Sequence, residues 1–167
     1  MSFILCKNDS KKIYIAVGES ESVHLAVNDL IKDIQSVCGD AELTSVREEA
    51  DVFVASTQSG EFANISGGRE IFTHEEEFCY RIENGKLYLL GMDDLGTMWA
   101  IYTFLEKELK TPPFYLFEDI QVEHKEKLEI EEKKVQEYPH TKFRGWFIND
   151  EDLLSGFQSK GKRNIDY

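Results

Sequence analysis

Apolar residues recur at every third or fourth position between residues 23 and 38, directly after a short β-rich run. The run Lys12–Val17 predicts a buried strand. The apolar spacing that follows predicts an amphipathic helix that ends at about Cys38, with Gly39 in the left-handed position that terminates many helices. Ser20 or Ser22 can cap its free N–H groups. A strand followed by a helix with one apolar face predicts a layer of sheet beneath a layer of helix.

The middle of the chain contains two further strand-like runs and a loop. Residues 42–46 and 51–56 are rich in apolar and β-branched residues, and each predicts a strand. Residues 57–69 contain three glycines together with several serine and asparagine residues, so we expect a loop there.

A β-hairpin is predicted around Asn84-Gly85. This dipeptide separates the β-like runs Phe78–Ile82 and Lys86–Leu90. A type I′ turn needs positive φ at both central residues, and Asn-Gly meets that need best. The two runs are therefore expected to pair antiparallel.

A second helix is predicted from Leu95 to Leu109. Its apolar residues form one face, which Trp99 and Phe104 widen. Pro112 and Pro113 follow it and cannot continue a helix.

Extended segments are expected at residues 114–122, 128–135 and 143–148. The order of elements is thus strand, helix, strands, hairpin, helix, strands. This order predicts an α+β fold, an α/β sandwich in which a mixed sheet carries two main helices packed chiefly on one face.

The net charge of −13 restricts the partners of such a chain. A strongly acidic surface repels phosphate backbones, so neither nucleic acid nor an anionic membrane is expected as a partner. The N-terminal apolar run is too short for a signal peptide, which predicts a cytoplasmic protein, although a secreted parent whose leader was removed stays open. Cys6, Cys38 and Cys79 match neither a zinc spacing nor a disulfide framework, and we interpret them as small buried apolar residues.

The glycine-containing stretch Gly91–Thr97 stands between a predicted strand and a predicted helix. Glycine turns at helix starts can bind phosphate, but this one lacks the P-loop lysine and places Asp93 and Asp94 where a phosphate would lie. The stretch is interpreted as a tight turn in which Asp94 caps the helix.

Other signals for catalysis or cofactors are weak. His74 precedes three glutamates, which we interpret as a solvated acidic loop rather than a cation site. Ser56 and Ser59 lack the G-x-S-x-G setting of an activated serine. No catalytic residue, cofactor or metal is predicted for this chain.

A polar cluster follows the predicted strand that begins at Arg144. The strand Gly145–Ile148 leads to Asn149 and to three carboxylates at residues 150–152. In a β/α barrel the functional groups lie at that end of a strand, and tryptophan, asparagine and aspartate suit sugar hydroxyls. By the residues alone, the preferred interpretation of the cluster is a strand that ends in a polar turn, which caps a helix at residues 153–155.

Three segments resemble parts of glycoside hydrolases. The stretch Gly91–Leu105 resembles the G-x-D-x-x-G-T-x-Y-A-I-Y segment in the N-terminal domains of β-hexosaminidases and of the family 67 and family 115 α-glucuronidases. The stretch Pro112–Val122 looks like S-P-W-Y-W-W-A-D-V-P-V of family 115, and Phe143–Asp152 resembles the Y-R-G-I-F-I-N-D-E-D that opens its barrel. Trp99 stands where the motif has tyrosine, and Pro112-Pro113 replaces Ser-Pro.

The resemblance implies a two-part organisation. Residues 1–140 would be an N-terminal accessory domain, and residues 141–167 would be the start of a truncated (β/α)8 barrel. A barrel needs about 250 residues, so the catalytic domain is expected to be missing from this chain. In the intact parent, Asn149 and Asp150 would be the residues that contact substrate.

Two hypotheses of function follow. In the first, the chain is a non-catalytic accessory domain whose partner is the missing barrel, and carbohydrate is bound only through the parent. In the second, it is a stand-alone binding module that exposes the surface around Trp146 and Phe147 and can dimerise through it.

Overall fold

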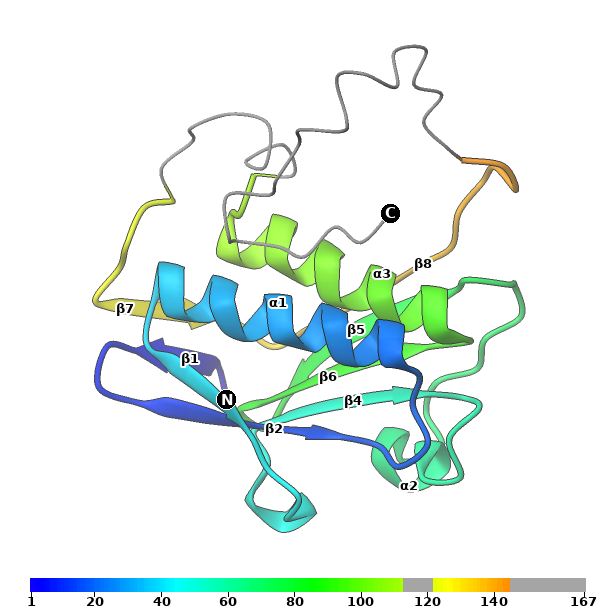
Figure 1. Ribbon diagram of the computed structural model, residues 1–167, viewed down its shortest axis with the longest axis horizontal. Helices are drawn as coiled ribbons and strands as arrows, with labels where there is room; N and C mark the ends of the chain where they lie inside the picture. Colours follow the sequence, from blue (N-terminus) through cyan, green and yellow to red (C-terminus); the bar gives the residue numbers. More distant parts are fainter. Residues whose placement is uncertain (113–121, 145–167) are drawn as a thin grey trace.

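A computed structural model describes residues 1–112 and 122–144, and these residues form an α+β fold. Two helices lie side by side over one face of a mixed sheet, as the sequence predicts (Figure 1). The strands are β1 (Phe3–Cys6), β2 (Ser10–Ile15), β3 (Asp40–Leu43), β4 (Val52–Ser56), β5 (Phe78–Glu83), β6 (Lys86–Gly91), β7 (Lys127–Ile130) and β8 (Lys133–Glu137). The helical segments are α1 (Glu21–Val37), η1 (Arg47–Glu49), α2 (Phe62–Ser66), α3 (Asp94–Phe104) and η2 (Leu105–Leu109).

The main sheet has six strands in the order β3-β2-β4-β6-β5-β8. The strands from β3 to β6 run parallel, whereas β5 pairs antiparallel with both β6 and β8. A separate antiparallel pair joins β1 to β7, so that Phe3 lies opposite Ile130. The sheet is therefore mixed, as predicted.

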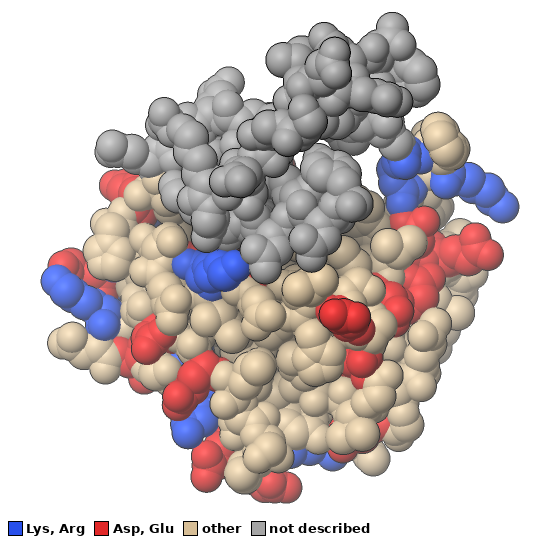
Figure 2. All heavy atoms as spheres, in the orientation of Figure 1, with Lys and Arg blue, Asp and Glu red and all other residues tan. Residues whose placement is uncertain are grey.

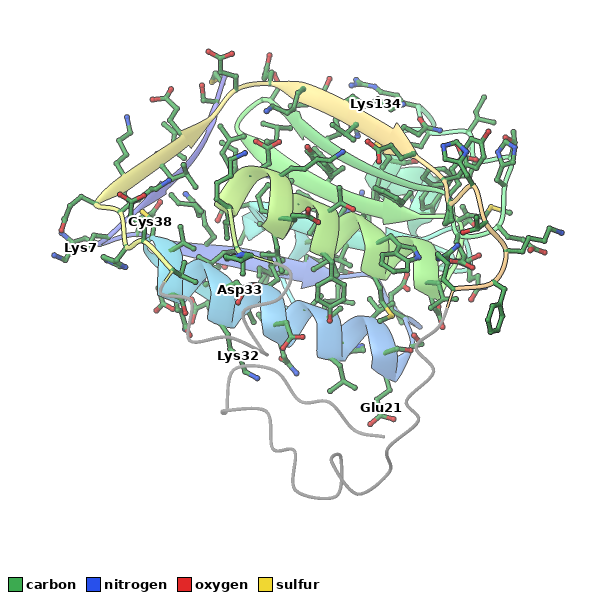
Figure 3. The ribbon with its side chains drawn as sticks, turned by 90° about the horizontal axis from the view of Figure 1, so that it is seen from above. Lys7, Glu21, Lys32, Asp33, Cys38 and Lys134 are labelled. Atoms are coloured by element: carbon green, nitrogen blue, oxygen red, sulfur yellow. The ribbon has the colours of Figure 1, made fainter. Side chains whose placement is uncertain are left out.

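The larger core lies between the sheet and the two main helices. Figure 3 shows α1 and α3 side by side on one side of the sheet, with β8 and Lys134 beyond them. Tyr102 on α3 donates to Asp29 on α1 over 2.9 Å and joins the two helices. Each aliphatic side chain buried here contributes about 1.5–3 kcal/mol relative to an exposed one. Buried members include Ile13, Val23, Val27, Leu30, Ile34, Val54, Leu87, Leu89, Ile101 and Phe104.

The opposite face of the sheet carries a smaller core and a buried ion pair. Phe53 stacks on Tyr88 with the ring centroids 5.1 Å apart. Arg81 extends over the Tyr88 ring, and its Nε lies 3.3 Å from a carboxylate oxygen of Glu70, whose side chain is fully buried. The short helix α2 covers part of this face. The prediction of a loop throughout residues 57–69 is therefore wrong, because Ile65 packs against this core and stabilises a turn of helix there.

The ends of α1 agree with the sequence prediction. The Ser20 hydroxyl accepts from the Val23 backbone N–H over 3.4 Å. Gly39 follows the C-cap Cys38 with a φ of +86°, and a Cβ there would lie 2.6 Å from the Cys6 carbonyl oxygen. Glycine is needed at this position for both reasons.

The predicted hairpin is confirmed. β5 and β6 pair from Phe78 with Gly91 to Glu83 with Lys86. Asn84 and Gly85 have φ of +53° and +76°, the positive pair that a type I′ turn requires.

The second helix divides into α3 and the π-helical turn η2, and it ends at Leu109 as predicted. Lys110 has a φ of +61° and terminates it two residues before Pro112. Phe104 is buried, but Trp99 is 37% exposed, so the expectation that Trp99 widens the buried face is wrong. The Trp99 ring lies instead beneath Arg144.

Several extended segments differ from the prediction. β3 begins at Asp40, two residues earlier than expected, and β1 had no counterpart in the prediction. The expected extended segment 128–135 is two strands in different sheets, β7 and β8. The Glu132 carboxylate lies between them and accepts from the Asn84 backbone N–H over 2.8 Å. Residues 113–121 and 145–167 lie outside the described residues, and with them lies nearly all of the predicted second unit, 141–167.

Candidate functional site

The turn from β6 into α3 is built around two close backbone approaches. A Cβ on Gly91 would lie 2.1 Å from the Thr97 backbone nitrogen, and one on Gly96 would lie 2.5 Å from the Glu77 carbonyl oxygen. Because these two glycines have no side chain, the end of β6, the start of α3 and the loop before β5 can lie against one another. The prediction of a tight strand-to-helix turn is confirmed.

Asp93, and not the predicted Asp94, caps α3. The Asp93 backbone is extended, which lets its Oδ1 accept from the Gly96 backbone N–H over 2.8 Å. Its Oδ2 accepts from the Glu76 backbone N–H over 2.9 Å, and its carbonyl accepts from the Thr97 hydroxyl over 2.9 Å. Asp94 is the first helical residue instead. The N–H group that could bind an anion at this turn is thus occupied by the protein's own carboxylate.

The loop before β5 is organised by Glu77. Its carboxylate accepts from the Thr73 backbone N–H over 2.6 Å, from the His74 backbone N–H over 3.0 Å and from the Gln136 side chain over 2.7 Å. Burial alone would raise the pKa of Glu77, but these hydrogen bonds outweigh it and lower the pKa to about 2. The interpretation of residues 75–77 as a solvated acidic loop is therefore wrong for Glu77, which is 6% exposed.

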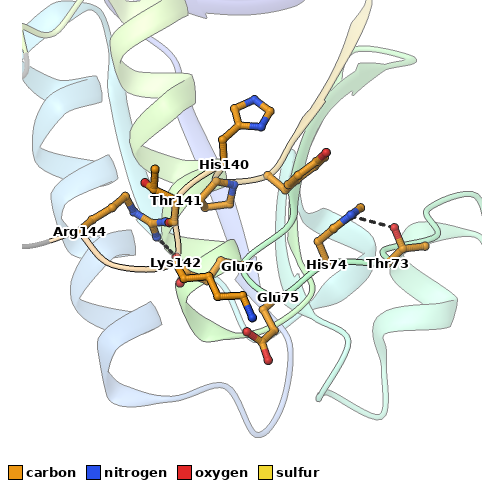
Figure 4. Close-up of a pocket in the computed structure, with 10 residues that line it drawn as sticks. Thr73, His74, Glu75, Glu76, His140, Thr141, Lys142 and Arg144 are labelled. Atoms are coloured by element: carbon orange, nitrogen blue, oxygen red, sulfur yellow. Dashed lines mark hydrogen bonds and ion pairs between the residues drawn. The ribbon is translucent and has the colours of Figure 1, made fainter.

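A polar pocket of about 330 Å³ lies where this loop meets the segment after β8 (Figure 4). The imidazole of His74 stacks on the Tyr138 ring with 3.9 Å between centroids, and His140 packs edge-on against Tyr138. The remaining lining residues are Thr73, Glu75, Glu76, Pro139, Thr141, Lys142 and Arg144. Both signs of charge line the pocket, which therefore offers hydrogen-bond donors and acceptors to a polar ligand.

Arg144 closes one side of this pocket. Its Nη2 forms an ion pair with Glu76, and its Nη1 donates to the Thr141 carbonyl over 2.5 Å. Its guanidinium carbon lies 5.4 Å from the centroid of the Trp99 ring, and the Trp99 indole N–H donates to the same Glu76 carboxylate over 3.0 Å. Arg144 belongs to one of the glycoside hydrolase-like stretches and Trp99 to another, so the fold brings these two stretches into contact.

Glu19, in the turn after β2, forms hydrogen bonds with Ser56 at the carboxyl end of β4. In open α/β sheets a ligand often binds where the chain moves from one side of a strand to the other, and here β3 and β4 flank β2. The Glu19 carboxylate accepts from the Ser56 backbone N–H over 2.6 Å and from its hydroxyl over 3.1 Å. Burial raises the pKa of Glu19 above its ordinary value. The Ser59 hydroxyl donates to the Val17 carbonyl oxygen, which is not a catalytic base.

The cysteines are free thiols. Cys38 and Cys79 are buried as predicted, whereas Cys6 is partly exposed. Burial raises the pKa of Cys79 to about 12, which leaves it almost entirely protonated at neutral pH. Within residues 1–112 and 122–144, histidine, cysteine and carboxylate side chains form no cluster that could hold a metal ion.

The predicted substrate-contacting residues, Asn149 and Asp150, lie outside the described residues. In the part of the chain that the structure describes, no helix is long and apolar enough to cross a membrane. On the side of the molecule that Figure 2 shows, uncharged side chains cover much of the middle of the part that grey atoms leave visible, and many of the charged side chains lie toward its margins.

Solved structures of several glycoside hydrolases contain the same fold. A family GH115 4-O-methyl-α-glucuronidase with specificity for decorated arabinogalactans superimposes with a TM-score of 0.76 and 24% identity, over 90% of this chain and 20% of that one. A chitobiase from Flavobacterium johnsoniae matches 95% of this chain and 21% of its own, with a TM-score of 0.58 and 16% identity. A family GH20 exo-β-N-acetylglucosaminidase from Vibrio harveyi matches with a TM-score of 0.52 and 12% identity, over 86% of this chain and 18% of its own.

The fold is therefore that of a part of glycoside hydrolases, and the resemblance in the sequence is confirmed at the level of the fold. The chain spans about a fifth of the length of these enzymes. Neither a protein-family model nor a curated protein matches the sequence.

Proposed function

We propose that residues 1–140 are the non-catalytic N-terminal accessory domain of a carbohydrate-active glycoside hydrolase of the α-glucuronidase type. Its catalytic (β/α)8 barrel begins within residues 141–167 and lies otherwise outside this sequence. The observation that carries the proposal is the match of 90% of this chain to only 20% of a family GH115 enzyme. Four-fifths of that enzyme has no counterpart here.

The chemistry of the described carboxylates supports a structural role. Glycoside hydrolysis needs two carboxyl groups held on either side of one glycosidic bond. Glu77 and Asp93 instead accept hydrogen bonds from the backbone of the domain itself. Glu70 pairs with Arg81 beneath the sheet, away from solvent. Glu77, Asp93 and Glu70 thus make contacts that stabilise the fold.

In the intact parent, the domain packs on the barrel and braces its sugar site. Asn149 and Asp150, at the end of the first barrel strand, are the residues that contact the substrate. The charge of −13 supports the absence of nucleic acid and anionic membranes among its partners.

The test compares the 167-residue chain with the product of a longer reading frame that continues past Tyr167. Both are incubated with a decorated arabinogalactan and with an aryl α-glucuronide, and released glucuronic acid is measured. Release by the longer protein alone supports the proposal, and the Asn149→Ala and Asp150→Asn variants of that protein should lose most of it. The Glu131→Gln variant, altered on the exposed Glu131, serves as the control. Hydrolysis by the 167-residue chain, or a longer frame without a barrel, overturns it.

A second candidate function is a stand-alone binding module. It is favoured by the exposed apolar side chains of Leu25, Leu95 and Trp99 on the two main helices, and of Phe143, which is 90% exposed. In this case the isolated chain dimerises or binds a glycan tightly. Light scattering and a glycan-array screen distinguish this function from the first, which predicts a monomer that retains no glycan.

A further inference from the structure

We propose that Glu76 and Trp99 form a docking site for the Arg144 side chain, and that this docking positions the polypeptide that follows Arg144 relative to the two main helices. The inference deepens the proposed function and rests on it in one respect, because that function makes this polypeptide the beginning of the catalytic barrel. Arg144 is then a positioning residue at the junction of two domains.

Three contacts converge on one guanidinium group. One nitrogen pairs with the Glu76 carboxylate, the other donates to the Thr141 carbonyl over 2.5 Å, and the guanidinium carbon lies over the Trp99 ring, 5.4 Å from its centroid. The Trp99 indole N–H donates to the same Glu76 oxygen over 3.0 Å. Glu76 therefore holds both the Trp99 ring and the cation that lies over it.

The docking site is set by the start of α3. Trp99 lies within α3, and the Glu76 backbone N–H donates to Asp93, the residue that caps this helix. The Glu76 backbone has a φ of +57°, a conformation that non-glycine residues adopt rarely. The Asp93 carboxylate, which caps α3, thus also fixes the loop that carries Glu76. Glu76 and Trp99 are therefore held in one arrangement.

Arginine fits this site better than lysine does. A guanidinium group can pair with a carboxylate and stack on an aromatic ring at once, because it is planar and has donors along its edge. Lys142, two residues earlier, lines the same pocket and forms no ion pair with another described residue. Lys142 is therefore a natural internal control.

Trypsin tests the docking directly in the 167-residue chain. Trypsin must bind the side chain that precedes the bond it cuts, so a docked Arg144 competes with cleavage of the Arg144–Gly145 bond. We expect roughly three- to tenfold slower cleavage after Arg144 than after Lys142, as one exposed ion pair together with a cation–π contact allows. Quantitative mass spectrometry of the early digestion products measures both rates in one sample.

Variants decide whether the protection comes from docking. Glu76→Gln and Trp99→Phe should each speed cleavage after Arg144 while leaving cleavage after Lys142 unchanged. Glu75→Gln, altered on the exposed neighbour of Glu76, should change neither rate. Circular dichroism verifies that each variant is folded. The Arg144→Lys variant gives a second measurement, because trypsin should cut after the lysine at this position faster than after the wild-type arginine. Equal rates at the two sites in the wild type, or equal acceleration at both in the variants, overturn the proposal.

A longer protein with activity permits a second test. There Arg144→Glu should lower kcat, and combining it with Glu76→Lys should restore much of the loss, which a merely destabilising change would not allow. No restoration overturns the positioning role. A protected Arg144 in a longer protein that lacks glucuronidase activity would refute the proposed function while leaving the docking intact.

Discussion

Gly91 lies so close to Thr97 that a Cβ on Gly91 would stand 2.1 Å from the Thr97 backbone nitrogen. The same glycine is the last residue of β6, so the end of a buried strand and the first turn of α3 are in direct backbone contact. Both residues belong to a stretch that resembles a glycoside hydrolase motif, and the contact gives that stretch a structural purpose.

Replacing Gly91 should therefore destabilise the domain. Because the clash is with backbone and not with a flexible side chain, Gly91→Ala should cost about 3 kcal/mol, at the upper end of overpacking changes. Urea denaturation followed by circular dichroism measures the loss. Gly60→Ala is the matched control, since a Cβ there meets nothing within 4 Å and the variant should be as stable as the wild type. Equal stability of the two variants would contradict the close approach.

The cap of α3 can be assigned by comparing two neighbouring aspartates. Asp93→Ala removes an acceptor for the Gly96 and Glu76 backbone N–H groups and should cost about 1–2 kcal/mol of the free energy of unfolding. Asp94→Ala removes only a favourable charge in the first helical turn, worth about 0.3–1 kcal/mol. The same urea titration ranks them, and a larger loss for Asp94→Ala would reverse the assignment.

The stability of the domain should depend on pH through Glu77. Its pKa is about 2 in the folded protein against 4.5 ordinarily, because hydrogen bonds to the carboxylate outweigh its burial. The folded state thus favours the charged form. This stabilisation is complete above a pH of about 5, amounts to roughly 3 kcal/mol and is lost as the pH falls toward about 2.

Glu77→Gln tests this dependence. The variant should be less stable than the wild type at neutral pH, and the difference should shrink on acidification between about pH 5 and about pH 2. Urea unfolding at a series of pH values gives the comparison. Glu75→Gln, in the same loop but exposed, should follow the wild-type curve. Parallel curves for Glu77→Gln and the wild type would disprove the assignment.

The buried pair of Arg81 and Glu70 should tolerate loss of both charges better than loss of one. Arg81→Met leaves the fully buried Glu70 carboxylate without the guanidinium 3.3 Å away and should cost about 3–5 kcal/mol. Adding Glu70→Gln removes a buried carboxylate that would otherwise keep only the more distant Lys134 ammonium, 3.9 Å away, and should recover part of that loss. A double-mutant cycle by urea denaturation measures the coupling, and purely additive losses would show that the pair does not interact.

Local features of the fold could be predicted from the sequence. The Asn84-Gly85 turn and the Ser20 cap depend on residues within a few positions of each other, so propensity and spacing suffice to find them. The strand β1 could not be predicted in this way. It pairs with β7 near the other end of the described chain, and four residues carry too little pattern to identify a strand without its partner.

The candidate site shows the same division. The sequence singled out the stretches that contain Trp99 and Arg144, but nothing in their spacing indicates that Glu76 lies between them. The choice of Asp93 over Asp94 as the cap also depended on the extended backbone of Asp93, between β6 and α3.

The sequence by itself determined the two main helices, the β5–β6 hairpin, the mixed sheet under the helices and the likeness to glycoside hydrolases, because periodicity, turn chemistry and short motifs are written in neighbouring residues. Only the tertiary structure decided which carboxylates are buried, which edge strands pair and where Arg144 docks. Those outcomes depend on contacts between residues far apart in the chain, whose geometry exists only once the core has packed.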